Sequence, residues 1–90
     1  MFSMQAQLIN ASGLHARPAS DFVKLAKSFA SRITVRRPEQ ADAVNAKSIV
    51  MILSQGFCKG TTIEITAEGP DEEAAAMALA ELIHSGFGEM

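Results

Sequence analysis

The 90-residue sequence predicts an α+β fold in which one four-stranded antiparallel sheet carries three helices on a single face. Short segments with an apolar residue at every second position alternate with segments whose apolar residues recur every three or four positions. Residues that favour turns, chiefly Gly, Pro and Ser, separate these segments. The resulting order is β-α-β-β-α-β-α. Because no internal linker or repeat interrupts it, we expect a single domain over residues 1–90.

The first half of the chain predicts three strands and one long helix. Residues 4–10 alternate as a strand does, and the loop residues 11–13 end it. Pro18 suits the first turn of a helix, where its missing N–H group costs nothing, and this helix is expected to continue to residue 30. Residues 32–37 and 43–45 predict two further strands. The expected buried positions of the helix are Ala19, Phe22, Val23, Ala26, Phe29 and Ala30.

The second half predicts two more helices and the most regular strand. Ser48 can cap a short helix at residues 49–53. Residues 61–68 alternate cleanly and predict the fourth strand. Asp71 is expected to cap the last helix, whose first turn carries two acidic residues near the positive end of the helix dipole. The expected buried stripe of this helix is Ala75, Ala78, Leu79, Leu82 and Ile83.

Composition excludes several classes of protein. A single Cys cannot form an internal disulfide, which indicates a reduced, cytoplasmic compartment, and we expect Cys58 to be a small buried hydrophobe. Two His and one Cys, far apart, cannot supply a structural zinc site, so no metal or other cofactor is expected. The start of the sequence lacks a signal-peptide pattern, and the apolar run at residues 49–53 is too short for membrane insertion.

Charge is distributed unevenly along the sequence. Residues 1–47 contain seven Lys or Arg against three acidic residues, whereas residues 48–90 contain one Lys against seven acidic residues. This basic excess is too small for a typical nucleic-acid-binding protein. A basic patch for an acidic partner or a phosphoryl group fits better, although an ordinary solvated surface stays open.

His15 is the residue best placed for chemistry. It precedes the first helix, where free N–H groups and the helix dipole favour an anion. A neutral imidazole nitrogen there can accept a phosphoryl group as a nucleophile, and the Arg17 guanidinium is suited to bind its oxygens. Spacing alone leaves this interpretation and an ordinary exposed His–Arg pair equally open. His84, in the last turn of the final helix, is expected to be structural or solvated.

Two segments resemble a known family. The sequence Gly13–Ala19, GLHARPA, resembles the active-site signature of the HPr family, the histidine-containing phosphocarriers of the bacterial sugar phosphotransferase system. The sequence Asn45–Ile49, NAKSI, resembles the serine segment of that family. The resemblance covers nearly the whole chain and implies an open-faced β-sandwich and a monomer. It implies that His15 accepts a phosphoryl group on its δ1 nitrogen from enzyme I, that Arg17 neutralises that group, and that an enzyme IIA receives it. The chain is then expected to be a carrier and not an enzyme.

The resemblance also implies a regulatory site and a docking surface. At Ser48 it implies phosphorylation by HPr kinase/phosphorylase, which creates a co-repressor for a catabolite-control transcription factor. Helix capping alone also explains a Ser at this position. An apolar patch beside a basic helix would form a mixed surface for enzyme I and enzyme IIA in turn. The residues expected in it are Lys24, Lys27, Ile49, Val50 and Leu53.

Two alternatives stay open at this point. The nitrogen-system paralogue of HPr shares the G-x-H-A-R-P pattern and relays phosphate to a regulatory enzyme IIA, although Lys47 favours the sugar branch. An interaction-only co-repressor would leave the histidine idle. The presence of His15, Arg17 and Ser48 in one chain argues against that second alternative.

Overall fold

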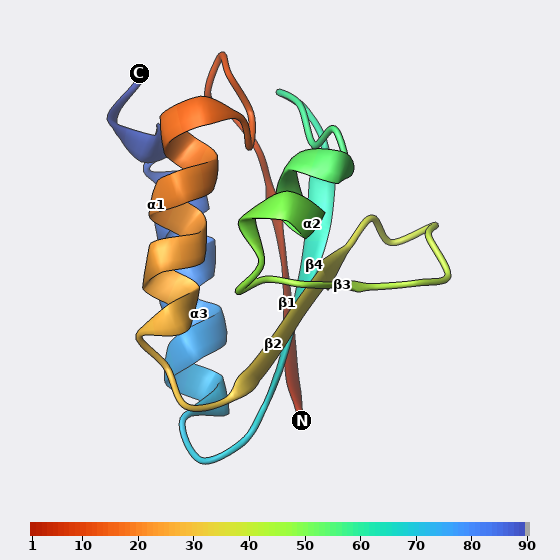
Figure 1. Cartoon of the computed structure of the whole chain (residues 1–90), viewed down its shortest axis with the longest axis vertical. Coiled ribbons are helices and arrows are strands. Elements are labelled where there is room, and N and C mark those ends of the chain that lie inside the picture. The colour runs from red at the N-terminus through yellow and green to blue at the C-terminus, as the bar shows by residue number, and fades with distance from the viewer. Residues whose placement is uncertain (90) are drawn as a thin grey trace.

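The computed structural model describes residues 1–89 and confirms the predicted α+β class, with a four-stranded antiparallel sheet and three helices. Figure 1 shows the helices gathered on one side of the strands. A short 3-10 helix, η1 (Gly86–Gly88), follows the last α-helix. The other elements are β1 (Phe2–Gln7), α1 (Ala16–Lys27), β2 (Arg32–Arg36), β3 (Val44–Asn45), α2 (Ile49–Ser54), β4 (Thr62–Glu68) and α3 (Glu72–His84).

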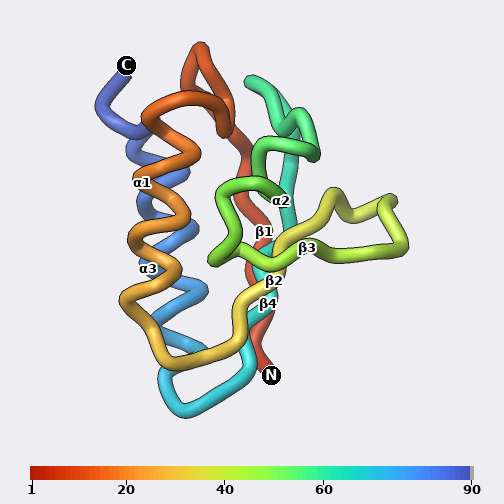
Figure 2. Tube along the Cα trace, in the orientation of Figure 1, coloured from red at the N-terminus to blue at the C-terminus, as the bar shows by residue number. Residues whose placement is uncertain are grey.

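The sheet has the strand order β1-β4-β2-β3, with every neighbouring pair antiparallel. The central strand β4 pairs with β1 from Phe2 opposite Ala67 to Gln7 opposite Thr62, and with β2 on its other side. The first and the last strand in the sequence, β1 and β4, therefore lie side by side, as the trace in Figure 2 shows. Alternate residues of β4 are fully buried under the helices, as the two-residue period of a strand requires.

The helices bury the expected faces with small shifts. Helix α1 begins two residues before Pro18 and ends at Lys27, so Phe29 is half-buried and Ala30 is exposed, contrary to prediction. The buried stripe of α3 is also rotated from the expected one, since Ala78 and Leu82 are only partly buried. The contacts of α3 with α1 and with the sheet, and not only the spacing of its apolar residues, determine which face of the helix is buried. The buried residues of α3 are Ala75, Ala76, Leu79, Ala80 and Ile83.

The side chain of Asp71 does not cap α3, which corrects the prediction for this residue. Its carboxylate instead accepts hydrogen bonds from the backbone N–H groups of Ala30 and Ser31, each at 2.9 Å, and from the Ser31 hydroxyl. These bonds tie the start of α3 to the loop between α1 and β2. The Ser31 hydroxyl, followed by the Ala30 N–H, holds the pKa of the Asp71 carboxyl below its usual value of 3.8.

We expect Asp71→Asn to remove part of the pH dependence of stability. A carboxyl whose pKa is lowered on folding contributes stability above its unfolded pKa and loses it as the pH falls. The wild-type protein should therefore melt at a higher temperature than the variant at pH 6. The difference should shrink as the pH drops below about 3.8. Thermal melts of both proteins between pH 2.5 and pH 7 test this expectation, and a constant difference over that range would contradict it.

Candidate functional site

The loop that leads to His15 is held at several points by backbone hydrogen bonds. The N–H of Gly13 donates to the Asn10 carbonyl at 3.2 Å, and the N–H of Leu14 donates to the Phe57 carbonyl at 2.8 Å. The Leu14 side chain is fully buried. The residue before His15 is therefore anchored in the core, which fixes where the backbone presents His15.

His15 occupies the N-cap position of α1, with an extended backbone and an exposed side chain. In the part of the chain that the structure describes, this side chain accepts no capping hydrogen bond. The first turn of α1 also has no acidic residue. Its N–H groups are thus left without a carboxylate and can face an anion. Arg17 is exposed in the same turn, and Ala16 between them has a positive φ of 51°.

Gly13 allows the close approach of two loops beside this site. Its φ is +62°, and a Cβ atom there would lie 2.5 Å from the Phe57 carbonyl oxygen and 2.6 Å from the Cα atom of Cys58. These are backbone atoms that cannot rotate away. The backbone of Phe57 and Cys58 therefore packs directly against the loop that precedes His15, and only Gly at position 13 permits this contact.

We expect Gly13→Ala to be more destabilising than the matched change Gly56→Ala. Gly56 has nearly the same φ, +63°, but a Cβ atom added there would have nothing within 4 Å. The control should cost about 1 kcal/mol, the penalty of a left-handed backbone alone. Gly13→Ala should cost at least about 1 kcal/mol more, because the backbone of a second loop must shift. Urea denaturation of both variants measures the two costs, and equal values would contradict the close contact.

Ser48 caps α2, as predicted, and its Oγ accepts the backbone N–H of Met51 at 3.3 Å. Within the apolar run that follows, only Ile52 is buried. The exposed fraction of Val50 is 71% and that of Leu53 is 43%. Ile49 and Met51 are exposed as well. Helix α2 therefore presents an apolar face to solvent, with Met51 as a member that sequence reasoning left out.

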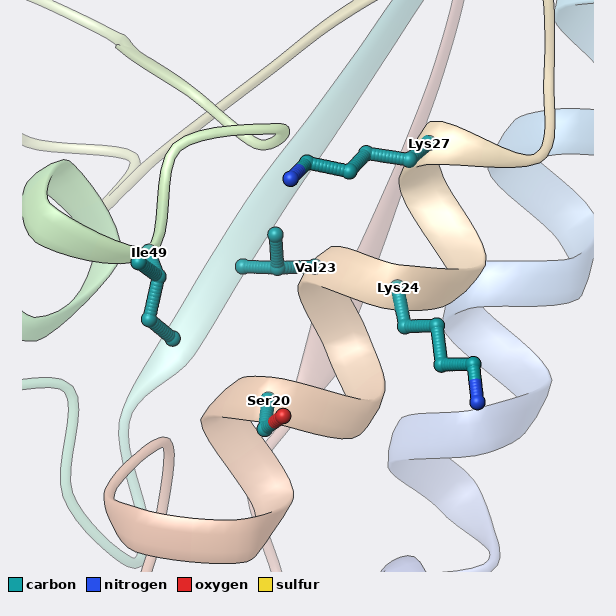
Figure 3. Close-up of a pocket in the computed structure, with 5 residues that line it drawn as sticks. All are labelled: Ser20, Val23, Lys24, Lys27 and Ile49. Carbon is teal, nitrogen blue, oxygen red and sulfur yellow. The ribbon is translucent and has the colours of Figure 1, made fainter.

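A shallow groove of about 330 Å³ separates α1 from α2. Figure 3 shows Ile49 and Val23 pointing into it from the two helices and Lys27 extending across it toward α2. Lys24 also lines the groove, but its amine points away from Ile49 (Figure 3). Three of the residues predicted for docking, Lys24, Lys27 and Ile49, thus line one groove between α1 and α2. Val50 and Leu53 are exposed on α2 but do not line this groove.

Beside the site, the structure contradicts one prediction and shows one feature for which the sequence made no prediction. Cys58 is exposed, not buried, because the neighbouring Phe57 fills the core at this point. Glu89 lies near the histidine loop and lines, with Arg17 and Asp21, a second hollow of about 400 Å³. No local pattern in the sequence indicates this approach of the last residues to the first helix.

Metal and membrane features are absent from the described part of the chain. Residues 1–89 contain no group of three or more His, Cys, Asp or Glu side chains arranged to hold a metal ion. Within the same residues, no helix is long and apolar enough to cross a bilayer.

The fold is that of the small α+β phosphocarrier proteins. Residues 2–85 match the family described as PTS HPr component phosphorylation site, and the chain belongs to this HPr family. The sequence is 38% identical over 89 residues to the phosphocarrier protein HPr of Neisseria meningitidis, covering 99% of this chain and 98% of that protein. It is 43% identical to part of a multiphosphoryl transfer protein of Vibrio cholerae, of which it spans only 20%.

Solved structures agree with this assignment. The HPr-C-His structure from Thermoanaerobacter tengcongensis superimposes with a TM-score of 0.93 at 46% identity, covering 100% of this chain and 99% of that one. A dimer of the HPr from that organism superimposes with a TM-score of 0.76. The chain is therefore a phosphocarrier of the phosphotransferase system and not an enzyme. Membership of the family implies partners such as enzyme I and enzyme IIA.

Proposed function

We propose that His15 carries the phosphoryl group between enzyme I and an enzyme IIA component for sugar uptake. An imidazole nitrogen of His15 attacks the phosphorus of a phosphohistidine on enzyme I, so one P–N bond forms as another breaks and the donor imidazole leaves with the electron pair. The same exchange then runs from His15 to a histidine of enzyme IIA. Each step conserves the phosphoryl group, as a carrier must.

The observation that supports this role most strongly is the position of His15 at the start of α1. The side chain is exposed to a partner, and the N–H groups of the first helical turn meet no carboxylate from that turn. A phosphoryl group on the imidazole would lie near these N–H groups and the positive end of the helix dipole. Arg17, exposed one residue beyond Ala16, supplies a permanent positive charge for its oxygens.

Incubation with phosphoenolpyruvate and enzyme I tests this proposal. Intact mass should rise by one phosphoryl group, and mild acid should remove it, since a phosphohistidine is acid-labile and a phosphoserine is not. An unchanged mass with a folded protein and an active enzyme I would contradict the proposal.

We propose that enzyme I and enzyme IIA bind in turn to the surface of α1 and α2. This surface combines exposed apolar side chains of α2 with Lys24 and Lys27 of α1, of which Lys27 extends toward α2. Apolar area supplies affinity for a partner, and the basic rim orients an acidic one. Because both partners would use one surface, each excludes the other, which suits a carrier that visits them in sequence.

We propose that Ser48 is the regulatory phosphorylation site for an HPr kinase/phosphorylase, and that the product acts with a catabolite-control transcription factor. A phosphate at Ser48 would stand beside Ile49, which lines the groove between α1 and α2. Its added negative charge would change the basic and apolar surface that the partners contact.

Ser48→Asp, which places a carboxylate at the same cap, should slow transfer from enzyme I by about tenfold or more, since one unfavourable charge in an interface costs above 1 kcal/mol. Ser48→Thr keeps the cap without the charge and serves as the control. Steady-state transfer rates from enzyme I measure the effect. Equal rates for both variants would contradict a regulatory role at this position.

We further propose that the chain works as a cytoplasmic monomer and a single domain. Strand β1 pairs along its whole length with β4 of the same chain, so the sheet is complete without a second copy. Light scattering after size exclusion should give the mass of one chain. A stable two-chain species at micromolar concentration would contradict the monomer.

A further inference from the structure

The segment of residues 86–89 returns to the loop that precedes His15. Figure 1 shows the C-terminal segment beside the N-terminal end of α1. Hydrogen bonds join Glu89 of this segment to Asn10 and Ser12, in the loop that leaves β1. The turn through η1 makes this return possible, with Gly86 and Gly88 both at positive φ and Phe87 at a φ of 56°. Glu89 follows directly and points its carboxylate at the loop.

The Glu89 carboxylate accepts three hydrogen bonds from this loop. Its Oε1 accepts the side-chain amide of Asn10 at 2.9 Å and the backbone N–H of Ser12 at 3.2 Å. Its Oε2 accepts the Ser12 hydroxyl at 3.0 Å. The backbone N–H and the hydroxyl of Ser12 thus bind the two oxygens of one carboxylate, which fixes both the backbone and the side chain of Ser12.

Other bonds hold the rest of the loop, but within residues 1–89 those two donors of Ser12 have only Glu89 as a partner. Asn10 links the carboxylate to the next residue, because the same amide nitrogen also donates to the Gly13 carbonyl at 2.9 Å. The Asn10 side chain is 1% exposed. The hydrogen bond from the buried Asn10 amide to the carboxylate is strong, because water cannot reach the amide and replace the carboxylate as acceptor.

The carboxylate is charged under physiological conditions. Hydrogen bonds from Asn10 first, and then from Ser12, hold the pKa of the Glu89 carboxyl below its usual range. The anchor is therefore complete at neutral pH. Arg17 and Asp21 of α1 line the hollow next to Glu89, so the tail and the first turn of α1 share one surface.

We propose that Glu89 is a positioning residue for phosphoryl transfer, which acts through Ser12 and Asn10 to hold the loop that carries His15. This inference rests on the proposed role of His15. Transfer between two imidazoles needs the attacking nitrogen in line with the phosphorus, and a displacement of about 1 Å can slow such a step by up to a hundredfold. The loop is fixed on one side by the Phe57 carbonyl and on the other by Glu89. Loss of the second anchor frees Ser12, three residues before the histidine.

The test compares Glu89→Ala with Glu81→Ala, which removes the same charge from an exposed position on α3. Glu89→Ala should lower kcat for transfer from enzyme I by about tenfold and leave KM for enzyme I unchanged, because the surface of α1 and α2 is intact. Glu89→Gln keeps one acceptor oxygen and should give an intermediate rate. The amide NMR resonances of Ser12 and Gly13 should move in Glu89→Ala and stay in place in the control.

A double variant tests the route of the effect. Ser12→Ala removes the hydroxyl bond, so Ser12→Ala combined with Glu89→Ala should be no slower than Glu89→Ala alone. Wild-type kcat in Glu89→Ala, with or without shifted resonances, overturns the positioning role. Strictly additive losses in the double variant overturn the route through Ser12. A wild-type protein that takes up no phosphoryl group contradicts the carrier role of His15 and this inference together, whereas an active wild type with an equally active Glu89→Ala contradicts this inference alone.

Discussion

Replacing His15 with Ala will abolish phosphoryl uptake from enzyme I while the protein stays folded. The imidazole is the nucleophile of the proposed step, and Ala offers no substitute atom. The side chain is exposed and makes no capping bond to α1, so its removal should change stability by less than about 0.5 kcal/mol. Intact mass after reaction with phosphoenolpyruvate and enzyme I measures the loss, and a thermal melt checks the fold.

His84→Ala is the matched control for this variant. His84 is the other histidine of the sequence and is exposed in the last turn of α3. Its removal should leave uptake unchanged. Acid-labile uptake that persists in His15→Ala and disappears in His84→Ala would place the phosphorylation site on α3 and contradict the proposed function.

Val50→Glu will raise KM for enzyme I without unfolding the protein. Val50 is 71% exposed on α2, so its side chain contributes little to the core. A carboxylate in the apolar part of an interface loses the buried contact and must be desolvated, at a cost of about 2 kcal/mol or roughly 30-fold in binding. Rates of transfer from a catalytic amount of enzyme I at varied concentrations of the chain, which is the substrate of enzyme I, measure this KM.

Met77→Glu separates a local effect from a change in net charge. Met77 is 52% exposed on α3, outside the surface of α1 and α2, and the substitution adds the same charge. Its KM for enzyme I should stay near the wild-type value. If the two variants raise KM equally, net repulsion explains the result and the docking surface is wrong. If neither does, enzyme I binds elsewhere.

Much of the fold could be predicted because its signals are local. The alternation in β4 and the three- and four-residue spacing in α1 follow directly from strand and helix geometry, so both elements were found near their observed positions. The segment around His15 is contiguous, so the proposed phosphorylation site and its arginine could be selected from the sequence alone. Ser48 was recognised as a cap by the same kind of local pattern.

The remaining features depend on contacts between distant residues. The carboxylates of Asp71 and Glu89 look like ordinary charged side chains in the sequence, and their partners lie 40 and 77 residues away. Cys58 was expected in the core on composition, yet the adjacent Phe57 takes that place. Which of two neighbouring apolar residues is buried depends on packing against other elements. The hydrogen bonds that hold the loop before His15 are therefore visible in the structure but not in the sequence motif around His15.

The carrier role is tested most directly by following one phosphoryl group through the protein. Phosphoenolpyruvate, enzyme I and this chain should yield a singly phosphorylated chain, and subsequent addition of an enzyme IIA should return its mass to the starting value as the mass of enzyme IIA rises. We predict that enzyme IIA stays unmodified when the chain is omitted or carries His15→Ala. Phosphorylation of enzyme IIA at the same rate without the chain would contradict the carrier role. A phosphorylated chain that never discharges to enzyme IIA proteins of the sugar system would contradict its proposed role in sugar uptake.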